Sequence, residues 1–126
     1  MFSHMMVGTN DMARSKKFYD ALFGAMGGKP GMEDPIGRVV YQHRGAVFLI
    51  TKPIDGQSAT PGNGHTIGFT VESPEEADAW HKAGASTGGT AIEDPPGERN
   101  GPAGRLYLAY LRDPDGNKLC ALHRLG

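Results

Sequence analysis

One pattern of strand, helix and further strands occurs twice in this chain, and that internal repeat restricts the possible folds more than any other feature. Three pairs of similar residues lie 61 positions apart: His4 and His65, Thr9 and Thr70, and Tyr19 and Trp80. The turn glycines Gly45 and Gly116 lie 71 positions apart, which implies about ten additional residues in the second half. A single unit of this kind leaves one face of its sheet bare, so two units are expected to cover each other.

The first half predicts a strand, a helix and a hairpin. The expected elements are strands over residues 2–7, 38–43 and 46–51 and a helix over 12–23. Thr9, Asn10 and Asp11 are favourable helix caps and stand directly before that helix. Residues 30–37, rich in Gly and Pro, are expected to form a loop.

The second half repeats this order. The expected elements are strands over residues 65–71, 90–93, 106–111 and 119–122 and a helix that begins after Ser73. Ser73 and Glu76 have the spacing of a capping box, and Pro74 suits the first helical position. Residues 94–104 are expected to form a long loop. Residues 113–117 (Asp-Pro-Asp-Gly-Asn) predict the tight polar turn of a final hairpin.

Residues 53–63 are rich in Gly, Pro, Ser and Thr and are the best candidate for a linker. They divide one domain, residues 1–126, into a first module over 1–52 and a second module over 64–126. At this length a single domain is the ordinary expectation.

Composition excludes several classes of function. The net charge is −1 and Lys and Arg are scattered, so no basic stripe for nucleic acid is present. No apolar run approaches the 18 or so residues of a membrane span. The N-terminal residues lack a basic region followed by an apolar one, so no signal peptide is expected. The single cysteine cannot form an intramolecular disulfide, and it fits a cytoplasmic setting.

Four segments together resemble the vicinal oxygen chelate superfamily, which includes glyoxalase I, extradiol dioxygenases and the bleomycin and fosfomycin resistance proteins. They are His4 before residues 7–11 (Val-Gly-Thr-Asn-Asp), residues 18–24 (Phe-Tyr-Asp-Ala-Leu-Phe-Gly), residues 64–69 (Gly-His-Thr-Ile-Gly-Phe) and the turn 113–117. The resemblance implies an α+β fold in which tandem βαβββ modules form an open, barrel-like mixed sheet with a central cavity. It also implies a homodimer.

The resemblance further implies a divalent metal ion, Zn, Ni, Fe or Mn, held by residues of the first and last strand of each module. Those positions are His4, Leu49, His65 and Cys120. Leucine and cysteine replace the usual acidic residues, so His4 and His65 are the metal candidates. In the other interpretation, both histidines are half-buried strand residues with ring nitrogens bonded to backbone or water.

Three further residues are catalytic candidates. Cys120 is either a reactive thiol or, flanked by apolar residues, a small core residue. Arg99, in the loop 94–104, either binds an anionic substrate or is a solvated surface residue. Tyr107 and Tyr110 alternate along one strand, so at most one of them lines the cavity, and Tyr107 is the candidate.

Two main functions follow from these residues. The first is a metal-dependent lyase or dioxygenase-like enzyme, although the loss of both acidic positions argues against ordinary lactoylglutathione lyase activity. The second is a metal-free protein that binds or sequesters a small molecule, as in antibiotic resistance. A third, weaker hypothesis is a domain whose cavity serves only dimer assembly.

Overall fold

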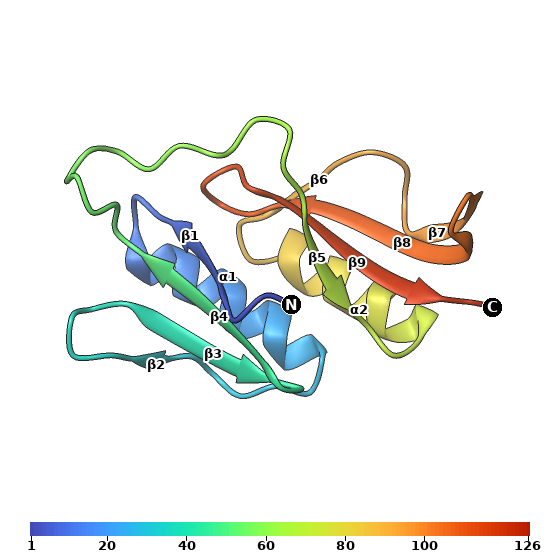
Figure 1. Ribbon diagram of the computed structural model, residues 1–126, viewed down its shortest axis with the longest axis horizontal. Coiled ribbons are helices and arrows are strands. Elements are labelled where there is room, and N and C mark those ends of the chain that lie inside the picture. The colour runs from blue at the N-terminus through green and yellow to red at the C-terminus, as the bar shows by residue number, and fades with distance from the viewer.

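The computed structural model describes all residues from Met1 to Gly126, and they form two mixed β-sheets with one helix packed on each (Figure 1). The helices are α1 (Met12–Ala25) and α2 (Pro74–Ala85). The strands are β1 (Met5–Gly8), β2 (Met32–Glu33), β3 (Val39–His43), β4 (Ala46–Thr51), β5 (Ile67–Thr70), β6 (Thr90–Ala91), β7 (Gly97–Gly101), β8 (Gly104–Arg112) and β9 (Lys118–Arg124). The expected α+β class is confirmed, and neither sheet closes into a barrel.

The two sheets have corresponding topologies. The first has the strand order β1-β4-β3-β2, and the second has the order β5-β9-β8-β6 with β7 also paired to β8. In each sheet the strand before the helix runs parallel to the last strand of that half. The register sets Met6 beside Leu49 in the first sheet and Gly68 beside Cys120 in the second.

Aromatic residues join α1 to the first sheet. The ring of Phe23 stacks on Tyr41 with centroids 4.6 Å apart, and Tyr19 lies 4.8 Å from Phe48. All four residues are buried. Aromatic contacts of this kind add to the free energy gained by burial of apolar area. They fix the helix on one face of the sheet, and Figure 1 shows the opposite face without a helix.

The two helices also pack on each other, and Gly84 of α2 allows the close approach. A Cβ atom on Gly84 would lie 2.4 Å from Leu111 Cδ1 and 3.1 Å from Leu22 Cδ1. Leu22 belongs to α1 and Leu111 to β8, so both helices and the second sheet meet at this point, within one core that also includes residues of the first sheet. Neither helix is long and apolar enough to cross a membrane.

The turn between β3 and β4 reaches the helix of the other half. Arg44, in a left-handed conformation with φ of 49°, precedes Gly45 in this turn. Its guanidinium binds the Glu76 carboxylate at 2.6 and 3.1 Å, near the beginning of α2. The expected capping box is therefore only half formed. Ser73 Oγ accepts from the Glu76 amide at 3.0 Å, while the Glu76 side chain turns to Arg44.

Two expected loops contain short strands. Residues 30–37 include β2, and residues 94–104 include β7, which pairs with β8 from Gly97 to Gly101. The β7 sequence, Gly-Glu-Arg-Asn-Gly, has no apolar alternation. It forms a strand because β8 has a free edge there, and the Glu98–Arg105 ion pair at 2.7 Å supports the hairpin.

Candidate functional site

The helix-free side of the second sheet carries Cys120, and we call it the free face. Leu111 and Leu119 are fully buried towards α2 and lie opposite each other in the β8–β9 register. Side chains alternate along strands, so the neighbouring pairs point to the other side. The free face is therefore formed by four cross-strand pairs: Tyr110 and Cys120, Arg112 and Lys118, Leu108 and Leu122, and Leu106 and Arg124.

Cys120 is the central residue of the free face, and its thiol is buried with only 6% of the residue exposed. Burial raises the pKa of the Cys120 thiol, and interaction with the Tyr110 hydroxyl only partly opposes this effect. Cys120 Sγ also donates to its neighbour's carbonyl, Ala121 O, at 3.5 Å. The thiol form is favoured over the nucleophilic thiolate, which is the state of a packing or hydrogen-bonding group.

Lys118 covers part of the Tyr110 ring. Its Nζ lies 5.0 Å from the ring centroid, within the range of a cation–π contact. The same ammonium group binds the carboxylate of Glu93. Burial and the adjacent Cys120 raise the pKa of the Tyr110 hydroxyl, so it stays a neutral hydrogen-bonding group.

Tyr107 lies on the opposite side of β8. Its hydroxyl donates to Asp78 Oδ1 of α2 at 2.6 Å, and this hydrogen bond raises the pKa of Tyr107. Only one of the two tyrosines thus shares a face with Cys120, and it is Tyr110. The sequence contained this information, because a hairpin turn at residues 113–117 sets position 110 opposite position 120.

Arg99 lies on β7 and is held by its own loop. Its guanidinium donates to Pro95 O at 2.8 Å and to Glu98 O at 3.4 Å. The register sets Arg99 beside Leu106, near the far end of β8. The structure does not bring Arg99, Tyr107 and Cys120 together as one group.

The histidines expected to bind metal precede the first strand of each half and are both exposed. His4 Nδ1 is hydrogen-bonded to Ser3 Oγ at 2.7 Å. No group of three or more His, Cys, Asp or Glu side chains is close enough to hold a metal ion. Leu49 offers no donor atom, and Cys120 favours its protonated form. The residues present therefore do not fit the three-donor set that a catalytic zinc-type site requires.

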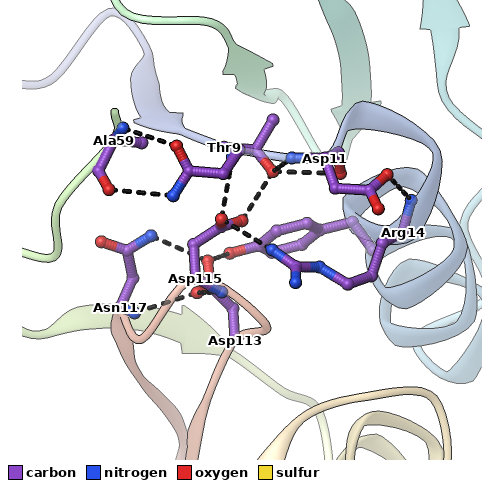
Figure 2. Close-up of polar contacts among 9 residues, drawn as sticks. Thr9, Asp11, Arg14, Ala59, Asp113, Asp115 and Asn117 are labelled. Atoms are coloured by element: carbon purple, nitrogen blue, oxygen red, sulfur yellow. Dashed lines mark hydrogen bonds and ion pairs between the residues drawn. The ribbon is translucent and has the colours of Figure 1, made fainter. Parts of the chain in front are cut away.

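The turn that follows β8 positions the free face by binding the first half (Figure 2). Asp115 accepts from Thr9 Oγ1 at 2.6 Å, from the Asn10 amide at 2.9 Å and from Arg14 Nη2 at 2.9 Å. The Asp115 side chain is only 2% exposed. Charge-assisted hydrogen bonds of this kind are stronger than neutral ones.

Asp113 makes a second set of contacts in the same turn. Tyr19 Oη donates to Asp113 Oδ2 at 2.6 Å, and Asn117 donates to both carboxylate oxygens, each at 2.9 Å. Burial, followed by the charge of Asp113, raises the pKa of Tyr19 well above its usual value. We call the contacts of Asp113 and Asp115 with the first half the clasp.

Several hollows flank the sheets, and two of them adjoin the linker. The larger, of about 1080 Å³, lies between the first sheet and the linker and includes Met6, Met12, Ile36 and Ile54. The smaller, of about 590 Å³, lies where the linker meets the β8–β9 turn and includes Arg112 and Lys118. The smaller hollow adjoins the free face through these two residues.

Comparisons with protein-family models and with solved structures point to the same family. The family model of the Glyoxalase/Bleomycin resistance protein/Dioxygenase superfamily matches residues 1–121. The solved structure of a glyoxalase/bleomycin resistance protein from Albidiferax ferrireducens T118 is 60% identical and covers 98% of this chain and 99% of its own, with a TM-score of 0.95. No curated relative matches the chain.

More distant structures share the fold alone. A glyoxalase-related enzyme from Fulvimarina pelagi is 21% identical, covers 98% of this chain and 88% of its own, and has a TM-score of 0.73. Lactoylglutathione lyase from Agrobacterium tumefaciens is 18% identical, covers 97% of this chain and 92% of its own, and has a TM-score of 0.65.

Proposed function

Because this chain belongs to the Glyoxalase/Bleomycin resistance protein/Dioxygenase superfamily, we propose that it binds a small molecule on the free face without a catalytic metal ion. The pairing of Cys120 with Tyr110 is the observation that carries this proposal. It puts a protonated thiol and a neutral phenol at the position where the resemblance predicted an acidic metal ligand.

The chemistry of the donor atoms supports binding over metal catalysis. Lewis-acid catalysis needs an ion on several firm ligands and a base that moves a proton. Leu49 supplies no ligand, and the raised pKa of Cys120 disfavours the thiolate that a metal ion would take. Because the raised pKa keeps the Cys120 thiol protonated at neutral pH, it cannot accept the proton that a catalytic base takes up.

The free face combines aromatic, apolar and charged groups, as expected of a surface that binds small molecules. Tyr110 offers an aromatic ring with a polar tip, while Leu108 and Leu122 offer apolar area. Lys118 adds a positive charge beside the ring. An aromatic or apolar small molecule with few polar groups would match these contacts.

The solved relative from Albidiferax ferrireducens T118 is described as a glyoxalase/bleomycin resistance protein, and at 60% identity it supports this class of function. The lactoylglutathione lyase neighbour is only 18% identical and supports no activity for this chain. We therefore favour a sequestering or resistance-type role over a lyase.

The test is a small-molecule screen by thermal shift, repeated on two matched variants. Tyr110→Phe removes a hydroxyl from the free face, and Tyr107→Phe removes one from the opposite side of the same strand. A ligand of the free face should lose affinity in Tyr110→Phe and keep it in Tyr107→Phe.

Elemental analysis of protein purified without chelator tests whether a metal ion is bound. A stoichiometric divalent ion that is lost in His65→Ala, together with metal-dependent turnover of a substrate, would overturn the metal-free proposal. Turnover of methylglyoxal with glutathione after addition of Ni²⁺ or Zn²⁺ would do the same.

We also propose that the protein works as a homodimer in the cytoplasm. The first sheet leaves the large apolar side chains of Met6 and Met32 exposed, and Phe2, just before β1, is exposed as well. Met6 pairs with Leu49 on the helix-free side of that sheet, so a second copy could cover it. Light scattering should give twice the monomer mass, and Met6→Lys should shift the mass towards the monomer.

A further inference from the structure

The smaller hollow described above, which we call the linker hollow, is polar and lacks acidic residues. Its nine lining residues are Pro61, Gly62, Asn63, Gly64, His65, Thr66, Arg112, Gly116 and Lys118. None is hydrophobic, and the charged ones are both cations. We propose that the linker hollow binds an oxyanion, the carboxylate or phosphate group of the small-molecule ligand.

Arg112 is the principal donor in the linker hollow. A guanidinium has five N–H donors in a planar fork that suits carboxylate and phosphate oxygens. In the structure only Nη1 is used, donating to Gly116 O at 2.8 Å. No carboxylate neutralises Arg112, whereas Lys118 is shared with Glu93. Arg112 therefore keeps both its charge and most of its hydrogen-bonding capacity for an anion.

Two glycines allow the residues that line the linker hollow to pack closely on one another. A Cβ atom on Gly62 would lie 2.0 Å from His65 Nδ1, so the imidazole packs directly on the linker backbone. A Cβ atom on Gly116, whose φ is +96°, would lie 3.2 Å from Pro61 Cγ. The linker end is thus seated on the turn, and the shape of the hollow exists before a ligand arrives, which lowers the entropic cost of binding.

Lys118 connects the linker hollow to the free face. It lines the hollow and also lies 5.0 Å from the Tyr110 ring centroid. An anion in the hollow would therefore stand next to an aromatic surface. The ligand class that fits both is an aromatic or apolar molecule bearing one carboxylate or phosphate group. The aromatic part of this inference rests on the proposed function, and the anion site can be tested by itself.

The experiment is a set of amide NMR titrations with three probes: inorganic phosphate, phenyl phosphate and benzyl alcohol. We expect phosphate to shift the amides of residues 62–66 and 116, and phenyl phosphate to shift these and Tyr110. Acetate in place of phosphate identifies which oxyanion is preferred. Arg112→Gln should weaken binding of both phosphates by about tenfold or more.

Lys17→Gln is the matched control, because Lys17 is an exposed cation of α1 outside both the linker hollow and the free face. It should change phosphate affinity by less than about twofold. Arg112→Lys, which keeps the charge but not the fork, should retain part of the affinity. Well-dispersed spectra of each variant establish that it is folded.

The outcomes separate the two proposals. Equal weakening in Arg112→Gln and Lys17→Gln, or no shift at residues 62–66 with phosphate, would overturn the anion site. Shifts at Tyr110 with benzyl alcohol but none with phosphate would overturn the anion site and support the proposed function. If phosphate shifts the amides of the hollow but neither phenyl phosphate nor benzyl alcohol shifts Tyr110, the anion site is supported and the proposed function is overturned.

Discussion

Tyr19 and Asp113 are 94 positions apart in the chain, and the hydroxyl of the first donates to the carboxylate of the second at 2.6 Å in the buried interior. This hydrogen bond ties α1 to the turn that carries the β8–β9 hairpin. The position of the free face therefore depends on a contact made entirely outside it.

Removing the Tyr19 hydroxyl should destabilise the whole domain. Tyr19→Phe keeps the ring packing but leaves a buried carboxylate with one fewer donor, so the free energy of unfolding should fall by about 1–3 kcal/mol. Urea denaturation measures the change. Tyr107→Phe removes a more exposed hydroxyl and should cost less than about 1 kcal/mol. Equal losses in the two variants would contradict this account of the clasp.

Stability should also decline at alkaline pH. The pKa of Tyr19 is raised by burial and by Asp113, and the pKa of Tyr41 is raised by burial and by Asp20. Both groups lose their protons at higher pH in the folded chain than in the unfolded chain. Their contribution to stability is therefore complete below about pH 10 and is lost as the pH rises above it. Urea midpoints should stay level from pH 8 to about 9 and fall as the pH passes 10, less steeply in Tyr19→Phe. A flat profile up to pH 11 would contradict this prediction.

Gly84 should not tolerate a side chain. Gly84→Ala would place Cβ 2.4 Å from Leu111 Cδ1 and should destabilise the domain by about 1–3 kcal/mol through overpacking. Gly24 is the control, because it also lies in a helix but a Cβ there meets nothing within 4 Å. Gly24→Ala should stabilise by about 0.4–1 kcal/mol through the unfolded state. Thermal melts of the two variants should shift in opposite directions.

Cys120 should react slowly with thiol reagents at neutral pH. The thiol is buried, and burial raises its pKa, so both access and thiolate fraction are low. Its rate with a disulfide reagent should rise with pH and should increase strongly after denaturation. Rapid reaction of the folded protein at pH 7 would show that Cys120 is an activated thiol.

Much of the fold could be predicted because local chemistry and tertiary structure agree in these segments. Strand β4 occupies the predicted residues 46–51, and Ser73 caps α2 as its spacing indicated. The turn at residues 113–117 fixed the register of the last hairpin. Each of these elements depends on residues close in sequence, which is where pattern arguments are strongest.

The remainder depends on contacts between distant residues. Strand β7 is too polar to be recognised and exists because β8 offers it an edge. Glu76 was expected to complete a capping box, but Arg44 from the other half binds it. The clasp joins residues up to 106 positions apart, and nothing in the separate segments identifies Thr9 as the partner of Asp115.

The two turn-to-helix ion pairs have opposite polarity. In the first hairpin the turn supplies the cation, Arg44, to Glu76 of α2; in the second the turn supplies the anion, Asp115, to Arg14 of α1. Two copies of the first half brought together in the same way would oppose Arg44 with Arg14, and two copies of the second would oppose Asp115 with Glu76. Like charges at these positions repel. These charges therefore favour packing of a first half against a second half over packing of two identical halves.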